Sequence, residues 1–74
     1  MEVYEYYINL DERGEFYADV RNPDGVTIWE VNTEAAQELQ VDGFVKDVRH
    51  AGDIGIYLKD IGLLPVMAEL KLAN

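Results

Sequence analysis

Two short turns constrain the fold of this chain more than any other feature of its sequence. They read Asp11-Glu12-Arg13-Gly14 and Asn22-Pro23-Asp24-Gly25, and each ends in a glycine that can adopt the positive φ of a bulged hairpin turn. Pro23 favours the second turn further, because its ring presets φ at the second turn position. Both turns join segments in which apolar and polar residues alternate. The sequence therefore predicts an antiparallel meander of three strands at about 2–10, 15–21 and 26–31.

The same turns predict which residues lie opposite one another. We assume that each turn is a three-residue loop with a bulged glycine and count outward from it. The predicted pairs are Asp11–Glu15, Leu10–Phe16, Ile8–Ala18, Tyr6–Val20, Asn22–Val26, Val20–Ile28 and Ala18–Glu30. Both turns then agree on one apolar face, and a slip of one residue would remove that agreement. This face contains Tyr4, Tyr6, Ile8, Leu10, Phe16, Ala18, Val20, Val26 and Ile28, with Glu30 as its only charge.

The opposite face mixes aromatic and charged side chains. It is predicted to contain Val3, Glu5, Tyr7, Asn9, Tyr17, Asp19, Arg21, Thr27, Trp29 and Val31. Glu5 pairs with Arg21 across the strands on this face. A three-stranded sheet with one main helix is usually covered on one side, and the more apolar face should take the helix. We therefore expect the face that carries Tyr7, Tyr17 and Trp29 to stay open.

The second half of the chain predicts two helices and one further strand. Asn32 or Thr33 can cap a short helix near 33–40, which Asp42-Gly43 then ends. A longer helix at about 53–61 has apolar residues at helical spacing, with Asp53 as its expected cap and Gly62 after its end. Gly55 inside it would allow a close approach to the sheet. Residues 44–50 fit either a short edge strand or the lead-in to this helix.

The tail at 66–72 alternates in polarity and is predicted as a fourth strand, although its composition also suits a helix that starts after Pro65. The predicted fold class is therefore α+β. A three-stranded antiparallel meander is packed on one face by the helix at 53–61, with the short helix near 33–40 and the possible strand at 66–72. The length of 74 residues and the absence of a linker indicate one small acidic domain, 1–74.

Charge is distributed unevenly along the chain. The formal net charge is −9, and residues 1–38 hold ten acidic residues against only Arg13 and Arg21. Direct binding to nucleic acid or to an anionic membrane is therefore disfavoured, because both need clustered Lys and Arg. An acidic surface can instead attract a basic protein. The chain lacks Cys, long apolar runs and a signal-peptide pattern, so we expect a cytoplasmic location.

Few residues of this sequence can support catalysis. It contains no Ser and no Cys, which excludes the common nucleophilic triads, and His50 is the only imidazole. His50 with Asp47 and Asp53 fits either an interaction at a helix terminus or a weak metal site. Paired carboxylates are the remaining catalytic option, but a solvated acidic face explains them better. We predict no enzymatic activity, no metal and no cofactor.

Three hypotheses about function follow. The first is a protein–protein interaction module with Tyr7, Tyr17 and Trp29 as anchors and with Glu5 and Asp19 at the rim. Its sharper form is an inhibitor of a basic or nucleic-acid-handling protein, with carboxylates in the place of phosphates. The second is a homo-oligomer that buries the aromatic face or the strand at 66–72 between copies. The third, ranked last, is a metal-binding protein or enzyme based on carboxylates and His50.

Overall fold

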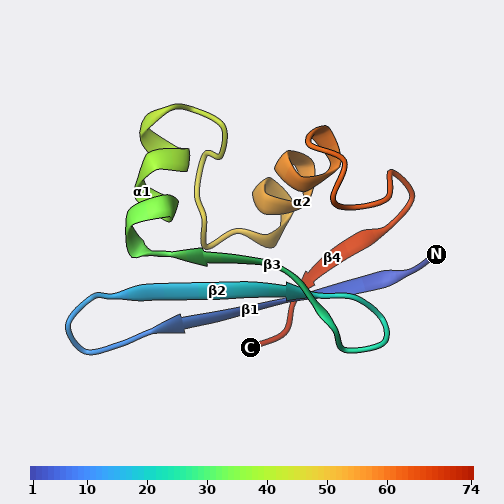
Figure 1. Cartoon of the computed structure of the whole chain (residues 1–74), viewed down its shortest axis with the longest axis horizontal. Coiled ribbons are helices and arrows are strands. Elements are labelled where there is room, and N and C mark those ends of the chain that lie inside the picture. The colour runs from blue at the N-terminus through green and yellow to red at the C-terminus, as the bar shows by residue number, and fades with distance from the viewer.

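The computed structural model describes residues 1–74 and shows the predicted α+β fold, with both helices on one side of a four-stranded sheet (Figure 1). The elements are β1 (Val3–Leu10), β2 (Phe16–Arg21), β3 (Thr27–Asn32), α1 (Thr33–Val41), α2 (Ala51–Asp60) and β4 (Glu69–Leu72). The strand order is β3-β2-β1-β4, with β4 parallel to β1 and the other pairs antiparallel. The tail is thus a strand, as predicted, although it begins at Glu69. Residues 44–50 form neither a strand nor a helix.

Both hairpin turns have the predicted geometry, and they are built in the same way. The Asp11 carboxylate accepts hydrogen bonds from the backbone N–H groups of Arg13 and Glu15 at 2.9 Å each. The side-chain oxygen of Asn22 does the same for Asp24 and Val26, at 3.0 and 2.9 Å. The closing glycines have φ of 80° and 82°. The predicted pairing of β1 with β2 is confirmed at every position from Leu10–Phe16 to Tyr6–Val20.

The predicted pairing of β2 with β3 is wrong beyond its first residues. Arg21 pairs with Thr27, but a bulge between Val20 and Arg21 shifts the rest, so that Val20 lies opposite Trp29 and Ala18 opposite Val31. One extra residue of β3 is accommodated there. The physical reason is burial: the shift places Trp29 and Val31 toward the helices and releases Glu30 from the apolar face. Val31 is buried and Trp29 packs against the core.

The helix ends follow local capping rules. Asn32 caps α1 by accepting a hydrogen bond from the Ala35 N–H at 2.9 Å. Helix α2 begins two residues earlier than predicted, and His50 is its N-cap residue without a side-chain hydrogen bond, so Asp53 lies in the first turn rather than at the cap. Both helices end in a glycine at C′ with φ of 80°, which allows the paired backbone hydrogen bonds of a Schellman motif.

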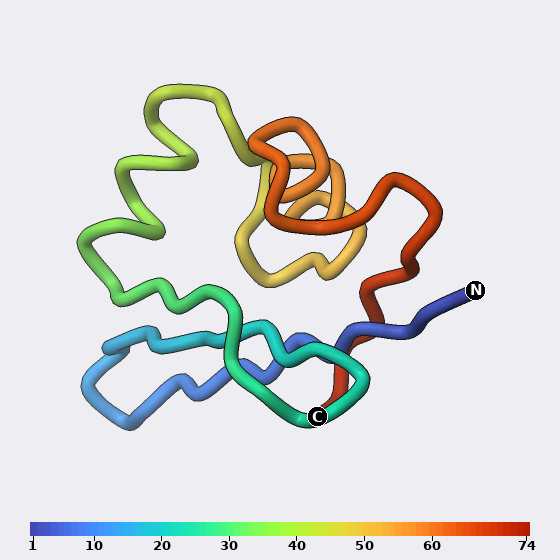
Figure 2. The backbone as a smooth tube through the Cα atoms, turned by 45° about the vertical axis from the view of Figure 1, so that its right-hand side comes forward, coloured from blue at the N-terminus to red at the C-terminus, as the bar shows by residue number.

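The core lies between the helices and the predicted apolar face, which is the face that is covered. The tube in Figure 2 follows the chain from β3 through α1 and α2 on this side and back to β4 beside β1. Tyr6 is fully buried, and its hydroxyl donates to the Val48 carbonyl oxygen at 2.7 Å. A Cβ at Gly55 would stand 3.4 Å from the Leu70 Cβ, which is van der Waals contact, so α2 comes close to the sheet here and no side chain larger than a methyl group has space.

The two ends of this face remain uncovered. Leu10 and Val26 flank the hairpin turns and are 60% and 57% exposed, because the turns project beyond the helices (Figure 1).

At the chain's end, the Asn74 side chain bonds both the N–H and the C=O of Ile8, at 3.0 and 2.8 Å. It thereby continues the pairing of β4 along β1. No helix has the length and apolar character required to cross a membrane.

Candidate interaction surface on the open sheet face

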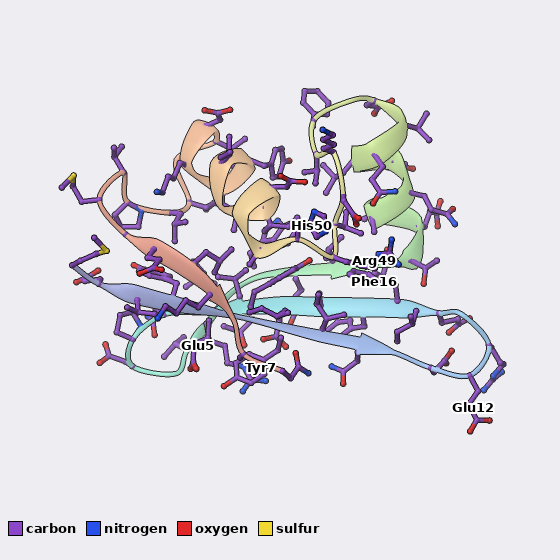
Figure 3. The ribbon with its side chains drawn as sticks, turned by 180° about the vertical axis from the view of Figure 1, so that it is seen from behind. Glu5, Tyr7, Glu12, Phe16, Arg49 and His50 are labelled. Carbon is purple, nitrogen blue, oxygen red and sulfur yellow. The ribbon has the colours of Figure 1, made fainter.

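The face of the sheet that carries no helix brings six charged and aromatic side chains together. We call this surface the open face and define it by Glu5 and Tyr7 of β1, Tyr17, Asp19 and Arg21 of β2, and Glu30 of β3. Cross-strand pairing aligns Tyr7, Asp19 and Glu30 in one row across three strands. Figure 3 shows Glu5 and Tyr7 on the side of the sheet away from the helices.

Asp19 is the central residue of the open face. It is only 6% exposed although no helix covers it, because side chains from all three strands of the meander surround it. The Arg21 Nε donates to the Asp19 Oδ1 at 2.9 Å. A buried carboxylate needs such a partner, since an unpaired charge would lose its hydration without compensation. The Asp19–Arg21 pair is therefore held in a defined position.

Arg21 also links this pair to the neighbouring strand. Its guanidinium carbon lies 3.8 Å from the centroid of the Tyr7 ring, which is a cation–π contact, and the Tyr7 hydroxyl donates to Glu5 Oε1 at 3.3 Å. Glu5 lies opposite Arg21 in the sheet, as predicted, but the ion pair of Arg21 is with Asp19. The hydrogen bond to Asp19 raises the pKa of Arg21, so the guanidinium keeps its charge.

Tyr17 is the exposed aromatic residue of the open face. It is 40% exposed, whereas Tyr7 is half-buried beneath the guanidinium. The pKa of Tyr17 is raised mainly by partial loss of hydration and, to a smaller extent, by its interaction with the Glu30 carboxylate. Its phenol is therefore neutral at physiological pH. Tyr17 also borders a shallow hollow of about 470 Å³, and the charged residues that line this hollow are all acidic: Asp11, Glu15 and Glu34.

Four of the five predicted interaction residues, namely Glu5, Tyr7, Tyr17 and Asp19, share this face, and the prediction of their placement is confirmed. Trp29 does not join them. The bulge in β3 turns it to the covered face, where its ring centroid lies 6.3 Å from that of Tyr57 on α2. The role of the four residues on the open face in binding a partner stays a prediction.

Two residues of the open face are not among the predicted interaction residues. Arg21 was placed on this face but not in the site, and Glu30 was placed on the opposite side. One signal for Glu30 was present in the sequence, because it was the only charge on an otherwise apolar face. A one-residue shift in β3 would have replaced it with the apolar neighbours Trp29 and Val31.

His50 lies between two carboxylates at the start of α2. Its ring nitrogens are 3.7 Å from oxygens of Asp47 and of Asp53. The Asp47 carboxylate also accepts the Arg49 backbone N–H at 2.9 Å, and this hydrogen bond, with that from the Arg49 side chain, lowers the Asp47 pKa. No group of three or more His, Cys, Asp or Glu side chains has an arrangement that could hold a metal ion.

No protein-family model matches the sequence, and no curated protein or solved structure shows significant similarity to it.

Proposed function

We propose that the chain is a non-enzymatic interaction module whose open face binds a basic partner protein. The observation that carries this proposal is the arrangement around Asp19: a buried carboxylate paired with the half-exposed Arg21, with exposed aromatic and acidic side chains beside them, on a face without helices. Tyrosine and arginine are enriched among residues that dominate binding energy. Because the Asp19–Arg21–Tyr7 contacts already hold their side chains, binding would cost little additional side-chain entropy.

The charge of the molecule supports a basic partner. The open face carries three carboxylates against one guanidinium, and the adjoining hollow adds three more acidic residues without any base. Such a surface accelerates the encounter with a positively charged protein and repels nucleic acids and anionic membranes. In the sharper form of the proposal, the partner handles nucleic acid, and the carboxylates occupy positions where it binds phosphates. The proposed location is the cytoplasm, which the absence of cysteine favours.

The proposal is tested by affinity capture from cell extract, followed by titration of the purified partner. Two variants change the open face: Tyr17→Ala, and the double variant Glu5→Gln with Glu30→Gln. The matched control is Glu2→Gln with Glu12→Gln, which removes two charges from exposed positions outside this face, Glu12 being at the tip of the first turn (Figure 3).

We expect Tyr17→Ala to weaken binding at least about fivefold, as loss of an interface anchor does. The open-face double variant should weaken it more than the control, and salt should weaken wild-type binding because it screens exposed charges. A partner that binds all variants equally and is indifferent to salt would contradict the proposal. Recovery of the chain alone would favour self-association through this face instead.

A further inference from the structure

The outer edge of β3 is not covered by another strand. β3 is the last strand in the order β3-β2-β1-β4, so one row of its backbone N–H and C=O groups has no partner in the sheet. Two hollows of about 250 and 230 Å³ lie along this edge, and both are lined by Glu30, Val31 and Ala35. An extended chain therefore has space beside the unpaired backbone groups.

The opposite edge of the sheet is less suited to accept a strand. β4 has only four residues and presents Lys71, and a lysine on an edge strand disfavours pairing with another chain. The edge of β1 beyond β4 is already occupied, since Ala73 and Asn74 bond to the backbone of Tyr6 and Ile8. β3 has six residues and contains neither Lys nor Arg.

An aromatic groove lies beside β3, and local rules explain how it forms. The groove is the 250 Å³ hollow, with the rings of Trp29, Phe44 and Tyr57 in its lining. The bulge in β3 turns Trp29 toward it. The Schellman motif at the end of α1, in which the Phe44 N–H donates to the Leu39 carbonyl oxygen at 3.0 Å, places Phe44 there. The ring centroids of Trp29 and Phe44 lie 6.3 and 6.2 Å from that of Tyr57.

The charge at this groove defines the kind of occupant. Its lining includes Glu30, Glu38 and Asp42 and no Lys, Arg or His, so every charged group there is negative. Phe44 is 65% exposed, which leaves its ring accessible. Aromatic rings attract cations through their negative faces, and carboxylates nearby add to that attraction. A lysine or arginine side chain satisfies both features, because its aliphatic stem contacts the rings and its charge meets the acids.

We propose that β3 accepts an extended basic segment of the partner as a fifth strand, with a lysine or arginine side chain of that segment in the aromatic groove. This inference rests on the proposed function, which requires a basic partner, and adds the mode of docking. Side chains of an added strand alternate between the two faces of the sheet. Basic residues at every second position of the segment would thus face the aromatic groove, and the residues between them would lie on the side of the open face.

The test titrates the intact chain with a capped decapeptide in which threonine and lysine alternate. Trp29 is the only tryptophan, so its fluorescence reports directly on the groove. Amide hydrogen exchange, resolved by NMR, reports on the backbone of β3. We expect the peptide to change the fluorescence and to protect alternate amides of β3. A peptide with glutamate in place of lysine should not bind, and N-methylation of alternate residues along one edge should abolish binding.

Variants separate the groove from the open face. Phe44→Leu removes one exposed ring and should weaken peptide binding about two- to fivefold, as loss of a cation–π contact does. Val41→Ala is the control, because Val41 is also an exposed apolar residue, at 83% against 65% for Phe44, and does not line the groove. It should leave peptide binding unchanged.

Three results would overturn the inference: no binding at 1 mM peptide, equal binding of the N-methylated peptide, or shifts confined to Tyr7 and Asp19 without protection of β3. None of them decides the proposed function, which depends on the captured partner and on the open-face variants. Conversely, a captured partner that binds all open-face variants equally and is indifferent to salt, together with intact peptide binding at β3, would contradict the proposed function and leave the docking mode in place.

Discussion

At the residue scale, two polar side chains within packed surroundings, those of Asp19 and Tyr6, hold neighbouring parts of the chain in place. Asp19 organises the open face through Arg21, and Tyr6 connects the sheet to the loop before α2 through its bond to the Val48 carbonyl oxygen. No buried side-chain nitrogen or oxygen lacks a hydrogen-bond partner. Each of these groups therefore stabilises one arrangement of its neighbours, because a shift would leave a buried polar atom unpaired.

Tyr6 should make the fold sensitive to alkaline pH. Burial, and then the negative charge of Asp47, raises the Tyr6 pKa well above the ordinary value of about 10, so the folded chain holds this proton longer than the unfolded chain. The free energy of unfolding should be constant with respect to this group below pH 10 and fall as the pH rises further. Chemical denaturation at pH 8 to 11.5 measures this slope.

Tyr6→Phe is the informative variant for this prediction. It should lower stability at pH 7 by about 1–3 kcal/mol, because the Val48 carbonyl oxygen loses its partner in the core. It should also reduce the alkaline slope. Tyr17→Phe serves as the comparison at an exposed position, where we expect a smaller effect at pH 7. An unchanged alkaline slope in Tyr6→Phe would contradict the prediction.

At the scale of elements, the contact between α2 and β4 depends on one small residue. Gly55 is buried at this contact, and its Cα hydrogen faces Leu70. A glycine inside a helix is unfavourable by itself, since alanine would be more stable there by about 1 kcal/mol. The close approach of helix and strand excludes larger side chains at this position, because even a Cβ would already be in van der Waals contact with Leu70.

Gly55→Val should destabilise the fold by about 1–3 kcal/mol, because its γ-methyl groups have no space against the Leu70 side chain. The matched control is Gly52→Val in the same helix, where a Cβ would meet no atom within 4 Å. There we expect a change within about 0.5 kcal/mol, since valine is not a worse helix former than glycine. Thermal and urea unfolding measure both; equal losses at the two positions would refute the packing argument.

At the scale of the whole molecule, the net charge of −9 opposes the compact state. The meander and α1 hold most of this charge, and the open face and its hollow bring acidic side chains near one another. Added salt screens such repulsion over distances beyond about 10 Å at 0.1 M. The same screening should weaken binding to a basic partner, so stability and affinity are expected to respond to salt in opposite directions.

Raising sodium chloride from 20 to 500 mM should therefore increase the thermal midpoint of the isolated chain by about 4–8 °C, the shift that corresponds to about 1 kcal/mol in a domain of this size. The variant Glu5→Gln with Glu30→Gln should show a smaller increase, because fewer charges repel one another. Calorimetry at several salt concentrations checks both. A midpoint that is constant or falls with salt would show that repulsion does not limit stability.

The sequence by itself determined the elements and most of the sheet. Turn chemistry at Asp11-Glu12-Arg13-Gly14 and Asn22-Pro23-Asp24-Gly25, the glycines after each helix and the alternation in the tail are local signals, and the structures they predict agree with those observed. They are readable because backbone sterics and capping act within a few residues. Five of the six residues of the open face were placed on it for the same reason, since alternation from a known turn puts them on one side.

Only the tertiary structure decided the position of Trp29 and Glu30. The second turn is compatible both with the predicted register of β3 and with the observed, bulged register. The bulged register is favoured because it buries Val31 and packs Trp29 against helices that come later in the chain. The start of α2 and the aromatic groove depend on the same long-range packing. Such contacts join residues that are far apart in the sequence, so no local pattern predicts them. They stabilise the observed arrangement only once the helices pack on the sheet.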